Sequence, residues 1–217
     1  MTFSGLFKST AVNKVGSGRL TLKTTGSTSP INVNGGTLEL TNSSSTPITT
    51  GLITVAANAV ITGTASVQNL TMKKGATTLC QLKASGNSKL TVKGNLKHSG
   101  DTILVAVPTS RRLKVGDEIT VYNVSGTHTG TFVVKVDDGG AGYEFDSSTL
   151  LTDGKLRVTA VADGVSQLIA DDALVDIYTT GGLILCKNKS YAEARASLRP
   201  GTYIVTHGNS SSKIRIY

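Results

Sequence analysis

The sequence predicts an all-β protein, most of it a parallel β-solenoid built from stacked short strands. Three observations lead to this prediction: an internal repeat, alternation of apolar and polar residues within each copy, and turn-forming residues between the copies. The 217-residue chain contains 24 Gly, 4 Pro and no Trp, and only 17% of its residues are charged. This composition is typical of many strands joined by Gly, Asn and Ser turns, and it does not indicate disorder.

The repeat is clearest near the start of the chain. Segments 14–25 and 31–42 read KVGSGRLTLKTT and INVNGGTLELTN, and aligning Gly18 with Gly36 places Leu20 on Leu38. Repeats of roughly 18 to 22 residues are typical of solenoids, in which each coil buries its apolar face against its neighbours. Weaker copies follow at 52–64, 67–83 and 88–100.

Alternation within the copies indicates which side chains face inward. LTMK at 70–73 and LTVK at 90–93 alternate apolar and polar residues, which is the period of a strand. An antiparallel sandwich would use the same strands, but the close similarity of the first two copies favours the solenoid. The inward face is predicted to carry Leu20, Leu22, Leu38, Leu40, Val55, Val60, Leu70, Met72, Leu90 and Val92.

Residues 103–160 change character and contain longer strands. We predict that they close the open end of the solenoid, because a bare strand edge would pair with other chains. No helical period is evident before residue 160. The predicted domains are therefore a β-solenoid stalk over 1–160 and a C-terminal domain over 161–217.

Charge and cysteine content limit the partners. The net charge is +8, but the basic residues are spread along the chain, as expected when outward Lys side chains keep strand edges soluble. No nucleic-acid-binding signature accompanies them, and no stretch is long and apolar enough to span a membrane. Cys80 and Cys186 fall in different predicted domains, so a disulfide is not favoured. Residues 1–5 lack a signal-peptide pattern, so we expect a fragment of a longer protein if the chain is secreted.

The repeat also resembles a known family. KVGSGRLTL and INVNGGTLELTN resemble the autotransporter-associated β-strand repeat of bacterial surface proteins, and YEFDSSTLLTDGKLRVT looks like the segment that closes such arrays. The resemblance covers about residues 8–160. It implies a right-handed parallel β-helix that serves as a passenger or stalk.

The C-terminal segment resembles a second family. VDIYTTGGLIL at 175–185, LRPGTYIV at 198–205 and KIRIY at 213–217 resemble the C-terminal sorting domain of the type IX secretion system of Bacteroidota. This resemblance implies a small Ig-like β-sandwich that the secretion machinery recognises, and an extracellular or outer-membrane surface location. Pro200 stands one place later than the proline of that family, and Thr202 replaces a common apolar residue. The matching positions, which we call the sorting motif, are Tyr178, Gly182, Leu198, Gly201, Tyr203, Ile204 and Val205.

No catalytic, metal-binding or cofactor-binding residue is predicted. His98, His128 and His207 each sit in a Gly/Ser/Thr-rich context (LKHSG, GTHTG and VTHGN), and none lies at a metal-ligand spacing from another His or Cys. We therefore expect three separate, solvated loop histidines. The sequence also contains neither a nucleophile elbow nor a phosphate-binding loop.

Three function classes remain open. The leading one is a non-catalytic C-terminal part of a secreted or cell-surface bacterial protein, in which a β-helical stalk or adhesin-like spacer carries an export and surface-attachment domain. The alternative is a carbohydrate-binding module for an anionic polysaccharide, attached to a carbohydrate-active enzyme such as a polysaccharide lyase or glycoside hydrolase. The third is an enzyme, which we expect in an upstream part of the parent protein and not in this fragment. The candidate glycan contacts are Lys73, Lys74, Lys83, Lys89, Lys93, Tyr122 and Tyr143.

Overall fold

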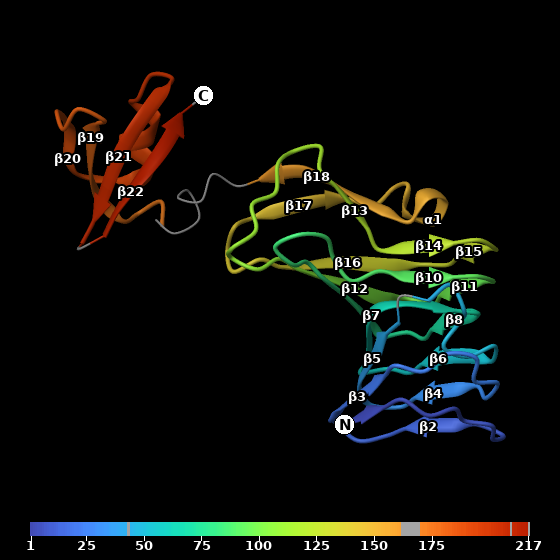
Figure 1. Cartoon of the computed structure of the whole chain (residues 1–217). Coiled ribbons are helices and arrows are strands. Elements are labelled where there is room, and N and C mark those ends of the chain that lie inside the picture. The colour runs from blue at the N-terminus through green and yellow to red at the C-terminus, as the bar shows by residue number, and fades with distance from the viewer. Residues whose placement is uncertain (43, 162–169, 209, 217) are drawn as a thin grey trace. The chain divides into compact units, whose positions relative to one another are not determined.

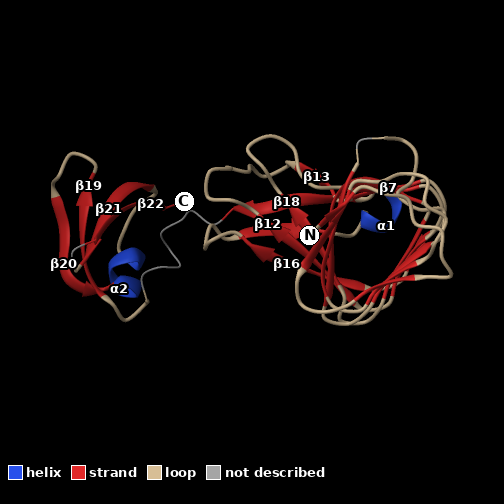
Figure 2. Cartoon of the chain, turned by 60° about the horizontal axis from the view of Figure 1, so that its bottom comes forward, coloured by secondary structure: helices blue, strands red, loops and turns tan. Residues whose placement is uncertain are grey.

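The described residues are almost entirely strand and loop, with two short helices among them (Figure 2). The computed structural model describes residues 1–42, 44–161, 170–208 and 210–216. The chain divides into two compact units, made of Met1–Gly139 with Glu144–Thr159 and of Gly140–Tyr143 with Ala160–Tyr217.

Most of the first unit is a stack of parallel strands (Figure 1). One sheet runs in the order β1-β3-β5-β7-β9-β12-β16. The bounds of these strands are β1 Thr2–Phe3, β3 Arg19–Leu22, β5 Gly36–Thr41, β7 Ala59–Val67, β9 Thr77–Gln81, β12 Asp101–Ala106 and β16 Phe132–Asp137.

Two further sets of parallel strands accompany this sheet. One has the order β15-β11-β8-β6-β4-β2, and in the other β10 pairs with β7 and with β14. Their bounds are β2 Val12–Lys14, β4 Ile31–Val33, β6 Leu52–Val55, β8 Asn69–Met72, β11 Leu96–His98, β15 His128–Thr129, β10 Leu90–Val92 and β14 Tyr122–Val124.

The strand register repeats at nearly the same interval in both large sheets. From β3 onwards, the first sheet pairs residues that are 18, 23, 17, 25 and 31 positions apart. From β2 onwards, the second sheet pairs residues 19, 22, 17, 26 and 32 positions apart. The predicted alignment is confirmed, because Leu20 pairs with Leu38. The repeat length predicted from the sequence is too short for the later passes of the chain.

Apolar side chains stack along the inside of these sheets. Of the ten predicted inward residues, eight are buried, and Leu20, close to the N-terminal end of the stack, is half-buried. Val60 is a correction: it pairs with Thr37 and Thr77 on the outer side, and its neighbour Ile61 faces inward with no exposed surface.

A small sheet and a short helix come from the segments on either side of the last pass of the stack. Three strands form a separate sheet in the order β13-β18-β17, and the backbone N–H groups of Val121 and Tyr122 donate to the Gly154 carbonyl at 2.9 and 3.1 Å. A one-turn helix, α1, ends at Gly154 in the left-handed conformation (φ 69°). A helix this short cannot show a helical period, so the sequence did not indicate it. The bounds are β13 Glu118–Thr120, β17 Tyr143–Asp146, α1 Leu150–Asp153 and β18 Lys155–Val161.

The second unit is one antiparallel sheet with a helix on one face. The strand order is β20-β19-β21-β22. The bounds are β19 Leu174–Thr179, β20 Ile184–Ser190, α2 Tyr191–Ala196, β21 Gly201–His207 and β22 Ser210–Ile216.

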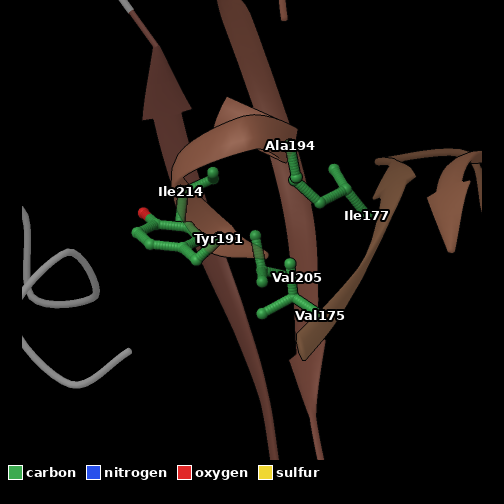
Figure 3. Close-up of a cluster of buried hydrophobic side chains, with 6 residues drawn as sticks. All are labelled: Val175, Ile177, Tyr191, Ala194, Val205 and Ile214. Carbon is green, nitrogen blue, oxygen red and sulfur yellow. The ribbon is translucent and has the colours of Figure 1, made fainter. Parts of the chain in front are cut away.

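The expected Ig-like sandwich is not what the described residues of this unit form. Their second layer is α2, whose Tyr191 and Ala194 pack against the sheet residues Val175, Ile177 and Val205 (Figure 3). Ser190 caps this helix by accepting a hydrogen bond from the Glu193 N–H at 3.4 Å. Ser followed three residues later by Glu, before alanines, is a helix-start pattern that the sequence already contained.

Candidate functional site

The two histidines of the stack meet inside it. His98 ends β11 and His128 begins β15, and these strands pair in parallel with Leu96 opposite His128. The Nε2 atoms of the two imidazoles lie 3.1 Å apart. The Nδ1 atom of His98 lies 3.0 and 2.9 Å from the two carboxylate oxygens of Asp101, at the start of β12. Asp101, His98 and His128 thus form one hydrogen-bonded series, which we call the histidine relay.

The inner part of the relay has no contact with solvent. The side chains of His98 and Asp101 are both 0% exposed, whereas His128 is half-buried. Burial, the largest cause, and the neighbouring His98 lower the pKa of His128 to about 4, while Asp101 acts in the opposite direction. His128 is therefore neutral at neutral pH, because a positive charge on its half-buried imidazole would be poorly solvated.

Aromatic rings hold the two imidazoles in place. The Tyr122 ring lies edge-on to both His98 and His128, with centroid distances of 5.6 Å in each case, and Phe132 lies 5.3 Å from His98. The Tyr122 hydroxyl donates to Oγ1 of Thr78 at 2.7 Å. Burial raises the pKa of Tyr122, so this hydroxyl stays protonated.

A pocket of about 240 Å³ opens beside His128. Its walls come from β14 and the turn after it, from His128, and from α1 with Gly154. Ion pairs tie the α1 side to β18 and β13, because Arg157 contacts Asp153 at 3.4 Å and Glu118 at 3.0 Å. The lining residues are Asn123, Val124, Ser125, Gly126, His128, Leu151, Thr152, Asp153 and Gly154.

The prediction of three separate, solvated loop histidines is wrong for His98 and His128. Only His207, at the end of β21, is exposed. The missed signal was positional: His98 ends β11 and His128 begins β15, and the parallel pairing of these strands from successive passes of the chain brings the two histidines together.

The tyrosine part of the predicted glycan surface is also wrong. Tyr122 is 0% and Tyr143 is 5% exposed, so neither offers a ring face to a ligand. Both belong to the apolar interior, where a Tyr is as well accommodated as at the surface once its hydroxyl finds a partner.

The lysines predicted to contact a glycan are exposed, but they lie in different turns of one pass of the chain and not on one strand face. Lys73 and Lys74 lie in the turn between β8 and β9, and Lys83 lies in the turn between β9 and β10. Lys89 immediately precedes β10, and Lys93 immediately follows it. Successive turns of one pass of the chain therefore carry these charges.

The sorting-motif residues have different environments. Val205 is buried in the core of the second unit, and Leu198 and Tyr203 pack against that core. The Tyr203 hydroxyl donates to the Arg199 carbonyl at 2.8 Å. Gly182 is exposed in the β19–β20 turn with φ +87°, and Gly201 begins β21.

The two tyrosines of the sorting motif are only partly buried. Tyr178 is half-buried, with its hydroxyl 3.4 Å from the Asp176 carboxylate, and Tyr203 lies at the margin of the core. The fully buried tyrosine is Tyr191 on α2. Ile204, also a motif position, is half-buried.

Across 1–42, 44–161, 170–208 and 210–216, no group of three or more His, Cys, Asp or Glu side chains is arranged to hold a metal ion. In the same part of the chain, no helix has the length and apolar character needed to cross a membrane. Cys80 and Cys186 are free thiols, the first buried and the second half-buried.

No protein-family model, curated protein or solved structure matches the chain.

Proposed function

We propose that the chain is the non-catalytic C-terminal part of a secreted or cell-surface bacterial protein. In this proposal the first unit is a right-handed parallel β-helix that acts as a stalk or adhesin-like spacer. The second unit directs export through a type IX secretion system and attachment at the outer-membrane surface.

The observation that carries the stalk proposal is the agreement between the register steps of the two large sheets. Each pass of the chain adds one strand to both sheets, with steps that differ by at most one residue. That relation is expected when the sheets are faces of one coil, because both then share the same residues per turn. Stacked coils make a rigid extended body suited to holding another domain away from a membrane.

Support for the export role comes from the sorting motif and its packing. Leu198, Tyr203 and Val205 hold β21 against the core that α2 completes. A motif that is also part of the core would couple recognition to correct folding, because an unfolded unit would not present it.

An export assay tests this function. The full chain, placed behind a general export signal, is expressed in a Bacteroidota host, and its amounts in periplasm, on the surface and in the medium are measured. We expect surface or medium localisation for the full chain, and periplasmic retention when residues 161–217 are removed or when the host lacks the secretion machinery. Equal localisation of the full and shortened chains would contradict the export role.

The stalk proposal has its own test. A crystal or cryo-EM structure of the full chain is expected to show one continuous right-handed coil through β16. A left-handed coil, or sheets from separate layers, would contradict it.

The anionic-glycan function has less support. Its two tyrosines are buried, and its lysines are distributed over successive turns. Retention of the chain on polygalacturonate at high salt would revive it, because binding through scattered lysines alone weakens with salt.

A further inference from the structure

The charge state of the buried end of the relay follows from its partners. Within the described residues, Nδ1 of His98 is the only hydrogen-bond partner of the Asp101 carboxylate, and both side chains are 0% exposed. A net charge buried in this way would be costly, which favours a neutral Asp101–His98 pair. Either the carboxylate is ionised against an imidazolium, or Asp101 keeps its proton and donates it to Nδ1.

Both neutral arrangements place a proton on Nε2 of His98. That N–H has Nε2 of His128 as its acceptor at 3.1 Å. A neutral imidazole that accepts at one nitrogen carries its proton on the other. His128 therefore carries its proton on Nδ1, and the lowered pKa of His128 agrees with the neutral ring that this requires.

The Nδ1 atom of His128 is accessible and has no partner among the described residues. The Nε2 atom of the same ring is used by His98. Nδ1 is not a sealed, unsatisfied atom, since the described residues contain no buried side-chain nitrogen or oxygen without a partner. His128 lines the pocket, so this donor is available to a bound molecule.

The rest of the pocket sets the chemical class of that molecule. Asn123, Ser125 and Thr152 carry side-chain donors and acceptors, and the lining residues include no Lys or Arg that would attract an anion. Pockets for drug-sized ligands span roughly 300–1,000 Å³, so a pocket of about 240 Å³ suits one small ring. Hydroxyl groups fit such a lining, because each both donates and accepts.

We propose that this pocket binds one sugar unit of a neutral glycan, with a ligand oxygen accepting a hydrogen bond from Nδ1–H of His128, a donor that the Asp101–His98 pair fixes. The site lies within the first unit and does not depend on the export role of the second. It adds recognition to a body that the stalk proposal treats as a spacer. In this assignment His128 contacts the ligand, and His98 and Asp101 are positioning residues.

The proton positions can be measured directly. Long-range ¹H–¹⁵N NMR of the imidazoles in the full ¹⁵N-labelled chain distinguishes a protonated ring nitrogen from an unprotonated one. At neutral pH we expect His128 with a protonated Nδ1 and an unprotonated Nε2. The opposite tautomer, or a His128 that gains charge at neutral pH, would overturn the assignment.

Ligand binding needs a second measurement. Methyl glycosides of glucose, galactose, mannose and N-acetylglucosamine are titrated at millimolar concentration, and binding is followed by saturation-transfer NMR of the sugar. The variant His128→Gln keeps an amide oxygen to accept from His98 but removes the Nδ1 donor, and we expect it to bind roughly tenfold more weakly. His207→Gln, an exposed histidine outside the pocket, is the matched control and is expected to bind as the unaltered chain does.

Each outcome of the titration decides the proposal. Saturable binding of at least one glycoside that His128→Gln weakens and His207→Gln preserves would support it. Absence of saturable binding to all four, or equal binding by both variants, would overturn it. Should His128→Gln fail to fold, Thr152→Val and Asn123→Ala, on the pocket wall, replace it with the same expected loss.

Discussion

His98 and His128 are far apart in the sequence, yet their Nε2 atoms lie 3.1 Å apart. The contact arises because β11 and β15 are neighbours in a parallel sheet, and the register that sets Leu96 opposite His128 leaves the two histidines only two positions apart along the strands. The same register stacks Leu70 on Ile53 and Leu96. Apolar ladders and the histidine relay thus have one structural origin.

The apolar ladder is expected to dominate the stability of the first unit. Leu70 is 0% exposed between two paired strands, so Leu70→Ala leaves a cavity and should lower the free energy of unfolding by about 2–5 kcal/mol. Thr71→Ala, the next residue on the outer side of β8, is the matched control and should change it by less than about 1 kcal/mol. Urea denaturation measures both, and equal losses would contradict the inward placement of Leu70.

Gly63 is expected to tolerate no side chain. It lies in β7 with φ +114°, and a Cβ there would overlap the carbonyl oxygen of Leu40 on the paired strand. Gly16 also has a positive φ of 73°, but a Cβ at that position would have no other atom within 4 Å. Gly16→Ala should cost about 1–2 kcal/mol from backbone conformation alone, and Gly63→Ala clearly more. Similar denaturation midpoints for the two variants would contradict the close approach of β5 and β7.

Acid is expected to destabilise the first unit through His128. Its pKa is lowered from 6.5 to about 4, so between these values the unfolded chain binds a proton that the folded chain does not. Stability therefore falls as the pH drops through this window, with no contribution from this group above it and no further loss below it.

The variant His128→Gln isolates this effect. Its unfolding free energy, measured by urea denaturation at several pH values, should depend less on pH across the window than that of the unaltered chain. His207→Gln should leave the dependence unchanged, because that side chain is exposed. Parallel curves for the chain and His128→Gln would contradict the lowered pKa.

The two cysteines are expected to differ in reactivity. Burial, partly offset by a hydrogen bond from Asn87, raises the pKa of the Cys80 thiol to about 12, so almost no reactive thiolate exists at neutral pH. Cys186 is half-buried on β20. Brief iodoacetamide treatment of the folded chain should alkylate Cys186 and spare Cys80, and urea should expose both to the reagent. Peptide mass spectrometry reads the result, and early alkylation of Cys80 would contradict its burial.

Local sequence patterns predicted the strands of the first unit well, since period-two alternation depends only on one face of each strand being buried. The alternation failed where apolar residues are consecutive. In Ala59-Val60-Ile61, only the register with β5 decides that Val60 faces outward and Ile61 inward. In the second unit, period-two alternation did not indicate the helix α2, which Ser190 caps at its start.

The contact between His98 and His128 could not be predicted from the sequence for a different reason. His98 and His128 have no local feature that separates them from solvated histidines. The pass of the chain that joins their strands is also much longer than the clearest repeat, which aligns Leu20 with Leu38. Tyr122 is of a residue type that often forms surface platforms for sugars, but in the structure it is fully buried.

The sequence by itself determined that this chain is all-β, that its first two copies pair with Leu20 beside Leu38, and which residue types form its turns. These properties follow from alternation and turn chemistry, which act over a few neighbouring residues. Only the tertiary structure decided the lengths of the later passes, the packing of α2 on the second sheet, the burial of Tyr122 and the meeting of His98 with His128. Each of these depends on contacts between residues far apart in the chain, where register and packing outweigh local preference.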